Sequence, residues 1–180
     1  MKKYDPKDND DDYFDKILDN ENRYNSYLKE CDEYVQNIQK TIEEIRKRKK
    51  VIVIWFADHG ASIGEKKGEK FYGVYAYEYT INSFCIFEYP IKKKIKIKKQ
   101  CSILDFYPSI LEFYGIKPLP NSKLEGSSLI QLSENENNFK ERSIFIETGG
   151  LYGYWPSPKK HNVFAVRFED KKIIYNDSSK

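Results

Sequence analysis

The chain has few of the features that would place it in a specialised class at once. Its cysteines are scattered, at Cys31, Cys85 and Cys101, without the short spacing of a metal-binding motif. Three cysteines in this arrangement give no disulfide framework and favour small apolar packing residues. No segment repeats along the chain, which excludes a solenoid or other repeat architecture.

Long apolar runs are also absent. The first thirty residues contain no apolar segment of the kind found in a signal peptide, and no run approaches the length of a membrane span. We therefore expect a soluble protein that stays in the cytoplasm, with no membrane segment.

Charge is abundant but nearly balanced, and aromatic residues are frequent. The 180 residues carry a net charge of +3, and 16% of them are aromatic, which argues against global disorder. The length suffices for one domain with a core. We expect residues 1–12 to form a flexible acidic terminus and residues 13–180 to form that domain.

A basic stretch at residues 91–100 alternates Ile with Lys. Such a patch attracts phosphate or nucleic acid. However, alternation with period two is typical of an edge strand with one solvated face, where Lys deters pairing with other chains. We favour an edge strand or a linker here and do not expect nucleic-acid binding.

The remaining pattern predicts alternating helices and strands. Apolar residues recur at three- and four-residue steps through residues 13–50, which predicts a long helix with a buried aromatic stripe. A second helix is expected at 102–114. Strands are expected at 51–56, 84–88 and 143–147, and a closing hairpin at 163–168 and 171–175. This order indicates an α/β fold with a mostly parallel sheet.

The segment Val51–Gly60 carries the main prediction of a functional site. Its six apolar residues run without alternation, which is typical of a strand buried on both faces, and the run ends in Asp58, His59 and Gly60. In open α/β sheets, ligands bind at the carboxyl ends of the strands. A carboxylate and an imidazole suit calcium, manganese or zinc. The alternative is a strand that simply ends in polar turn residues.

A charged loop follows this candidate metal site. Residues 61–72 contain Glu65, Lys66, Glu69 and Lys70, which either contact an anionic substrate or are solvated loop charges.

Several further segments follow one another in an order known from one family. They are Asp58-His59-Gly60 with Ser62-Ile63-Gly64-Glu65, then Tyr77-Glu78, Ile103–Leu111, Gly126-Ser127-Ser128-Leu129, and Ala165-Val166-Arg167 before Lys171–Ile174. Together they resemble the C-terminal portion of the sulfatases, within the alkaline-phosphatase-like superfamily. The resemblance implies part of a three-layer sandwich with a mostly parallel sheet and a C-terminal β-hairpin.

The same resemblance implies a hydrolase of sulfate esters that depends on a divalent metal ion. Asp58 and His59 would be metal ligands, and Lys66 or Lys70 would neutralise charge on the anionic ester. Tyr72 stands where many members of the family carry a histidine. Phosphoester hydrolysis or phosphotransfer, as elsewhere in the superfamily, is the alternative chemistry.

The nucleophile of the family is missing from this sequence. No cysteine has the Pro and Arg of the family's Cys/Ser-x-Pro-x-Arg motif after it, and the first metal-binding carboxylates are absent. We therefore expect a truncated or split sulfatase that is inactive alone and needs a chain or segment supplying the N-terminal half. A non-catalytic remnant or binding domain is the alternative.

Overall fold

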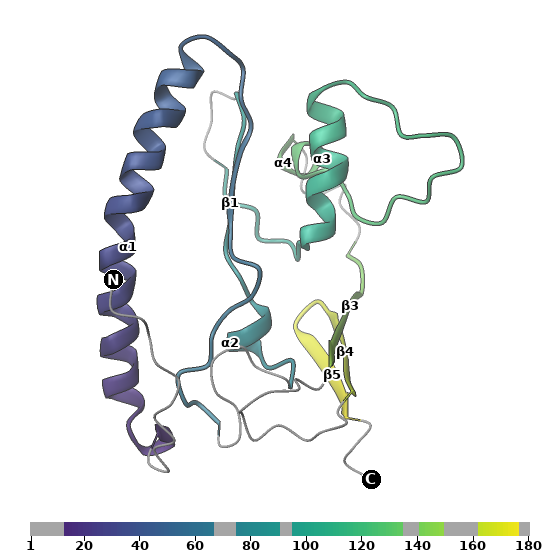
Figure 1. Ribbon diagram of the computed structural model, residues 1–180. Helices are drawn as coiled ribbons and strands as arrows, with labels where there is room; N and C mark the ends of the chain where they lie inside the picture. Colours follow the sequence, from purple (N-terminus) through teal and green to yellow (C-terminus); the bar gives the residue numbers. More distant parts are fainter. Residues whose placement is uncertain (1–12, 67–74, 91–94, 135–140, 150–161, 177–180) are drawn as a thin grey trace. The chain divides into compact units, whose positions relative to one another are not determined.

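The structure is a computed structural model that describes residues 13–66, 75–90, 95–134, 141–149 and 162–176 (Figure 1). These residues fall into two compact units. The first contains the described residues up to Glu88, and the second is built from Tyr89–Ile146 and Ala165–Ile174; the ends of the C-terminal strands belong to the first unit. The acidic terminus expected at residues 1–12 lies outside the described residues.

The first unit begins with a short 3-10 helix, η1 (Tyr13–Asp15), and the long helix α1 (Ile17–Arg46). The helix is confirmed, but its predicted burial is wrong, since no residue of α1 is buried. Tyr34, within the predicted stripe, is 61% exposed. The reason is length: α1 extends about 45 Å, whereas each strand of the neighbouring sheet covers only about 13 Å. Over the described residues, α1 is therefore much longer than the neighbouring sheet, and most of its apolar stripe is exposed.

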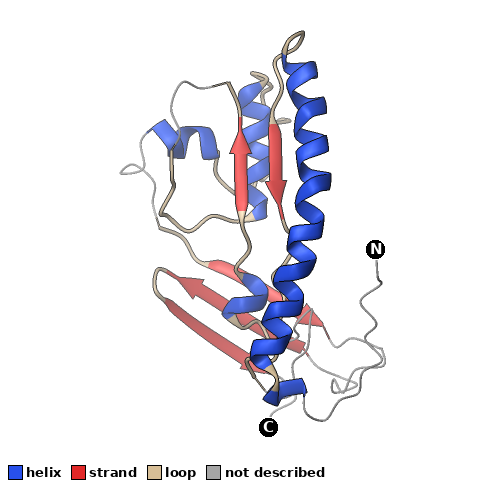
Figure 2. Cartoon of the chain, turned by 90° about the vertical axis from the view of Figure 1, so that its left-hand side faces the viewer, coloured by secondary structure: helices blue, strands red, loops and turns tan. Residues whose placement is uncertain are grey.

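That sheet consists of β1 (Val53–Phe56) and β2 (Cys85–Glu88), which are antiparallel with Val53 opposite Glu88 and Phe56 opposite Cys85 (Figure 2). The predicted mostly parallel sheet is therefore wrong for the described strands. A parallel pair needs a crossover to the other end of the sheet. Among the described residues of the connection, 57–66 and 75–84, the one helix is the single turn α2 (Glu78–Ile81), which is held at the end of β1, so β2 starts where β1 finishes.

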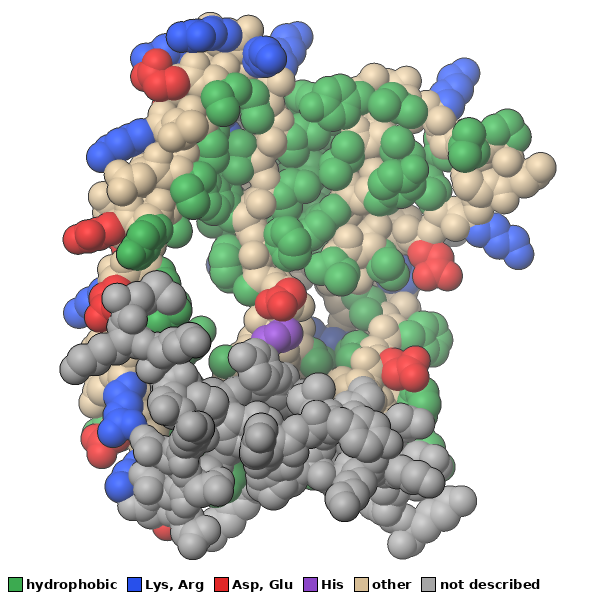
Figure 3. All heavy atoms as spheres, in the orientation of Figure 1, with side chains coloured by type: hydrophobic (Ala, Val, Ile, Leu, Met, Phe, Trp, Pro, Cys, Tyr) green, Lys and Arg blue, Asp and Glu red, His purple; other side chains and the backbone are tan. Residues whose placement is uncertain are grey.

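The expectation that β1 is buried on both faces is also wrong. Phe56 is 49% exposed, and the other residues of the strand are only partly buried. Apolar side chains lie at the surface over α1 and β1 (Figure 3). The run of six apolar residues thus includes a strand that the described residues cover only in part.

A charged cluster joins α1 to the sheet. The Glu88 carboxylate accepts hydrogen bonds from Arg46 (2.7 Å) and from the indole nitrogen of Trp55 (2.6 Å). Partial burial would raise the pKa of Glu88, but these hydrogen bonds outweigh it and lower that pKa below its ordinary value.

The stability of the first unit should accordingly depend on the charge of Glu88. A carboxyl group whose pKa is lowered by folding stabilises the fold above its unfolded pKa of about 4.3 and loses this contribution as the pH falls through the folded pKa. We expect Glu88→Gln to lower the free energy of unfolding by about 1 kcal/mol at pH 7, allowing for solvent screening, and by nothing at pH 2. Urea unfolding at both pH values tests this, with the exposed Glu44→Gln as the matched control.

The second unit contains the 3-10 helix η2 (Ile103–Asp105), α3 (Phe106–Phe113) and α4 (Leu129–Glu134). Ser102 begins η2 with a capping box: its hydroxyl accepts from the Leu104 amide, while Asp105 accepts from the Ser102 amide. The helix expected at 102–114 is confirmed, whereas α4 lies within residues 118–141, whose sequence predicts a polar connection. The apolar spacing of the 102–114 helix predicts a buried side made of Ile103, Phe106, Tyr107, Ile110, Leu111 and Tyr114. This prediction is partly wrong, because Ile103 and Tyr107 are more than half exposed.

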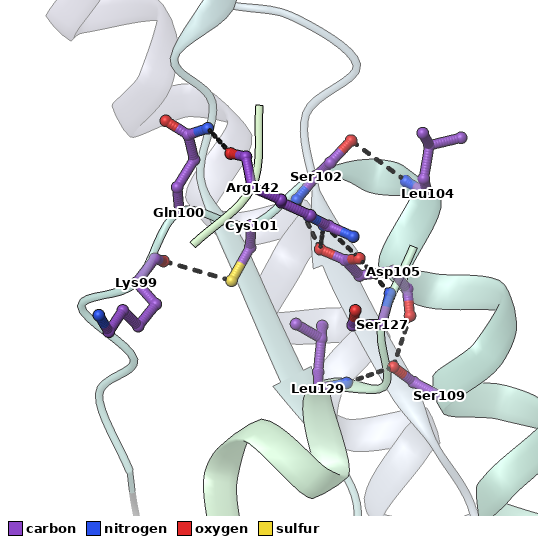
Figure 4. A network of polar contacts seen from close by, with 10 residues as sticks. All are labelled: Lys99, Gln100, Cys101, Ser102, Leu104, Asp105, Ser109, Ser127, Leu129 and Arg142. Atoms are coloured by element: carbon purple, nitrogen blue, oxygen red, sulfur yellow. Dashed lines mark hydrogen bonds and ion pairs between the residues drawn. The ribbon is translucent and has the colours of Figure 1, made fainter. Parts of the chain in front are cut away.

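The buried residues of η2 and α3 are polar instead. Asp105 is 1% exposed and accepts hydrogen bonds from the Ser127 amide (2.7 Å) and from Arg142, in addition to the cap (Figure 4). Ser109 is fully buried; its hydroxyl donates to the Asp105 carbonyl and accepts from the Leu129 amide. These bonds join η2 and α3 to the start of α4.

The C-terminal strands form a three-stranded sheet in the order β3 (Ile144–Gly149), β4 (Asn162–Phe168) and β5 (Lys171–Asn176). The predicted hairpin is confirmed, with its turn at Glu169-Asp170. Residues 95–100 contain no strand, so the edge-strand interpretation is wrong for them and the linker interpretation holds. Gln100 donates to the carbonyls of Arg142 and Arg167, which fixes this linker to β4. No helix within the described ranges is long and apolar enough to cross a membrane.

Candidate metal and anion site

Asp58 and His59 lie just past the end of β1 and approach one another. Asp58 Oδ2 is 3.6 Å from His59 Nε2, and Asp58 Oδ1 accepts from the His59 amide at 2.9 Å. The other ring nitrogen, Nδ1, lies 2.7 Å from the Gly60 carbonyl. Because a carbonyl only accepts, this contact places the proton on Nδ1 and a lone pair on Nε2, the nitrogen next to the carboxylate.

Gly60 joins this pair to α2. Its amide donates to the Thr80 carbonyl at 2.8 Å. A Cβ at position 60 would lie 2.1 Å from the Tyr79 carbonyl oxygen, closer than any side chain tolerates. The glycine is therefore required by the close approach of two backbones. This contact holds the Tyr77-Glu78 segment beside the candidate ligands.

The loop after Gly60 is held in place from two directions. Within the loop, Glu65 accepts from the Ser62 hydroxyl (3.1 Å) and from the Ile63 amide (2.8 Å). From the start of the chain, the Tyr13 hydroxyl donates to the Ser62 carbonyl and the Asn20 side chain donates to the Ile63 carbonyl. Glu65 is thus engaged in holding the loop, which favours a structural role over contact with an anion.

Sequence reasoning missed Tyr13 and Asn20. Both fall within residues 13–50, which were predicted only as a helix, and nothing local marks contacts across 49 and 43 residues. The Ser62-x-x-Glu65 spacing was a usable signal, since it is the pattern of a capping box. Here the serine and the glutamate pair in a loop rather than at a helix terminus.

Lys66 extends from the end of this loop. Its ammonium lies over the ring of Tyr77, with Nζ 4.2 Å from the ring centroid. Lys66 is exposed. The other two residues predicted to bind the substrate, Lys70 and Tyr72, lie outside the described residues, so their positions stay predictions.

Asp58 and His59 have the geometry of two neighbouring ligands of a metal ion. The two facing atoms, Oδ2 and Nε2, are separated by about the distance between neighbouring ligands of one ion, and the Nδ1–carbonyl hydrogen bond is the outer contact that metal-binding histidines commonly make. Asp58 is 83% exposed and thus open to an ion. Within the described ranges, no group of three or more His, Cys, Asp and Glu side chains comes together. A catalytic zinc ion usually takes three protein ligands, so Asp58 and His59 alone would be one ligand short of such a site.

Comparisons with known proteins relate this chain to one family. A sequence model of the sulfatase family matches residues 1–116. Arylsulfatase K of Mus musculus is 31% identical over 122 residues, covering 65% of this chain and 21% of that protein. Arylsulfatase K of Homo sapiens is also 31% identical over 122 residues and is covered to 22%. The chain thus spans about a fifth of the length of these curated relatives.

A solved structure is also similar. It is that of BT4656 in complex with its substrate D-glucosamine-2-N,6-O-disulfate, which superposes with a TM-score of 0.60 at 25% sequence identity. The match covers 83% of this chain and 30% of that one.

Proposed function

The chain belongs to the sulfatase family, and from this premise we propose that it supplies the Asp58–His59 part of a metal-dependent site that hydrolyses sulfate esters. One observation carries the proposal: Asp58 Oδ2 and His59 Nε2 lie 3.6 Å apart at the end of β1, with Nδ1 turned away to the Gly60 carbonyl. This arrangement leaves two donor atoms of the right chemistry on one side of the turn.

Each residue of the site has a distinct role in this proposal. Asp58 and His59 hold a divalent ion, for which calcium, manganese and zinc are the candidates. When bound, such an ion supplies Lewis-acid polarisation of an ester oxygen. Lys66 attracts the anionic ester and offsets its negative charge. Lys70 and Tyr72 remain further candidates for substrate contact.

Sulfate is favoured over phosphate as the ester. The solved neighbour has a substrate that carries sulfate groups, and the curated relatives are arylsulfatases. Phosphate esters serve as the comparison substrate in the assay below.

Turnover is proposed to require the rest of a sulfatase domain. The site has two candidate ligands, and Phe56 and Ile86 on the two-stranded sheet are about half exposed. An isolated pair of strands is marginally stable in water. We propose that the complete three-layer sandwich adds strands and the nucleophile from a further segment or partner chain.

Metal titration tests the proposal. We expect calorimetry with zinc, manganese and calcium to detect binding by the chain, weakened at least about tenfold in an Asp58→Ala/His59→Ala double variant. Asp19→Ala, which removes an exposed carboxylate from α1, is the matched control and should bind as the unchanged chain does. Sulfate and phosphate aryl esters are assayed on the same samples.

Either of two results would contradict the proposal. Equal metal binding by the double variant would place any site elsewhere. Turnover that survives loss of Asp58 and His59 would mean that these residues do not form the hydrolytic site.

A further inference from the structure

The contact between Lys66 and Tyr77 joins two segments that are each fixed to the Asp58–His59 turn. Lys66 directly follows the loop held by Glu65. Tyr77 directly precedes α2, whose Thr80 carbonyl accepts from the Gly60 amide. The 4.2 Å distance from Nζ to the ring centroid is within the range of a cation–π interaction.

Two further tyrosine rings lie close to the Tyr77 ring. The ring of Tyr75 lies 5.8 Å from it and the ring of Tyr79 lies 5.7 Å from it, centroid to centroid. Aromatic rings at these separations stabilise one another. The ammonium therefore rests on a ring whose own position is restricted.

An exposed lysine needs such a restriction to act as a fixed charge. Its stem has four rotatable carbons, and its side chain carries about 2 kcal/mol of rotamer entropy. A ring against one side of the ammonium limits its positions, and an ammonium has three N–H donors, so it can contact the ring and still donate to other groups. Those donors suit the oxygens of a tetrahedral anion.

We infer that Tyr77 is a positioning residue, which holds the ammonium of Lys66 where the anionic group of an ester is bound. This inference rests on the proposed function for the role of Lys66. It adds that the aromatic face of Tyr77, and not its hydroxyl, is what the site requires.

The test is an NMR titration of the full chain with inorganic sulfate, in the presence of zinc and with lysine ε-carbons labelled. Lys66→Met assigns the Lys66 signal. In the unchanged chain we expect that signal to be shifted upfield by the Tyr77 ring and to move as sulfate is added. Tyr77→Leu should remove the ring shift and weaken sulfate binding about two- to fivefold.

Two further variants separate positioning from folding. Tyr77→Phe keeps the ring and should bind sulfate as the unchanged chain does. Tyr24→Leu removes a partly exposed tyrosine from α1 and is the matched control, expected to leave both the shift and the affinity unaltered. In a Lys66→Met background, Tyr77→Leu should cause no additional loss of sulfate binding.

Several outcomes would overturn the inference. They are a Lys66 signal without a ring shift in the unchanged chain, a signal that sulfate does not move, or equal sulfate affinity in Tyr77→Leu. Failure of the proposed function looks different: metal binding would be indifferent to Asp58 and His59 while the Lys66 signal still responds to sulfate and to Tyr77→Leu.

Discussion

Gly60→Ala should lower the free energy of unfolding by about 3 kcal/mol and weaken metal binding by Asp58 and His59. The added Cβ would lie 2.1 Å from the Tyr79 carbonyl oxygen and 3.1 Å from its carbon. Because both are backbone atoms, no rotamer change relieves the overlap. The turn or α2 must move, and the Gly60–Thr80 hydrogen bond is lost with it.

Gly115→Ala is the matched control for this prediction. Gly115 has a positive φ of 64°, yet a Cβ there would have nothing within 4 Å. Only the cost of the left-handed backbone remains, about 1 to 2 kcal/mol, and metal binding should be unaffected. Urea unfolding and zinc titration of both variants check the prediction. If Gly60→Ala binds zinc as tightly as Gly115→Ala, the contact between α2 and the turn does not hold the site.

Asp105→Ala should destabilise the second unit by about 3 to 5 kcal/mol, the largest effect that we expect from removing one side chain. Its carboxylate is almost fully buried and accepts from two backbone amides, those of Ser102 and Ser127, as well as from Arg142. Without it, both amides lose their acceptor and Arg142 loses a buried counter-charge.

Asp170→Ala, in the β4–β5 turn, provides the control, because it removes a carboxylate that is exposed. It should change stability by no more than about 0.5 kcal/mol. Thermal unfolding of both variants, followed by circular dichroism, measures the difference. A loss below about 1 kcal/mol for Asp105→Ala would show that the Ser102 hydroxyl cap and Ser109 hold η2 and α3 without the carboxylate.

The positions of the strands and of the helices α1 and α3 could be predicted because they depend on local patterns, whereas the short helices α2 and α4 were not predicted. The apolar run before Asp58, the periodicity through α1 and the turn at Glu169-Asp170 each carry their own signal. The relative direction of neighbouring strands has no such local signal in the sequence. It depends on the Gly60–Thr80 contact, which brings the chain back to the end of β1 and makes β2 antiparallel.

Burial was harder to predict than secondary structure. The stripe on α1 and the run in β1 are apolar, and apolar residues predict burial. The sequence pattern does not identify which segment would bury them. Conversely, Asp105 and Ser109 are polar and nearly fully buried, since each satisfies backbone groups from a distant segment. The residues expected on the buried side of the same helix, such as Tyr107, are largely exposed.

The residues of the candidate site also differ in whether local sequence could predict them. Asp58 and His59 could be predicted from their place after an apolar strand, and they do lie side by side. The positions of Tyr13, Asn20 and Tyr77 around them depend on contacts between distant segments. For Glu65 the sequence left two alternatives, contact with an anionic substrate or a solvated loop charge, whereas its hydrogen bonds hold the loop.

The most direct test of the proposed metal site is the nitrogen NMR spectrum of the His59 imidazole during a zinc titration. The chain has two histidines, so a His161→Gln variant leaves only the His59 signals. We predict the Nδ1-protonated form before zinc is added and a zinc-dependent shift at Nε2 that disappears in Asp58→Ala. The opposite tautomer, or zinc binding that leaves Nε2 unshifted, would contradict the assignment of Asp58 and His59 as metal ligands.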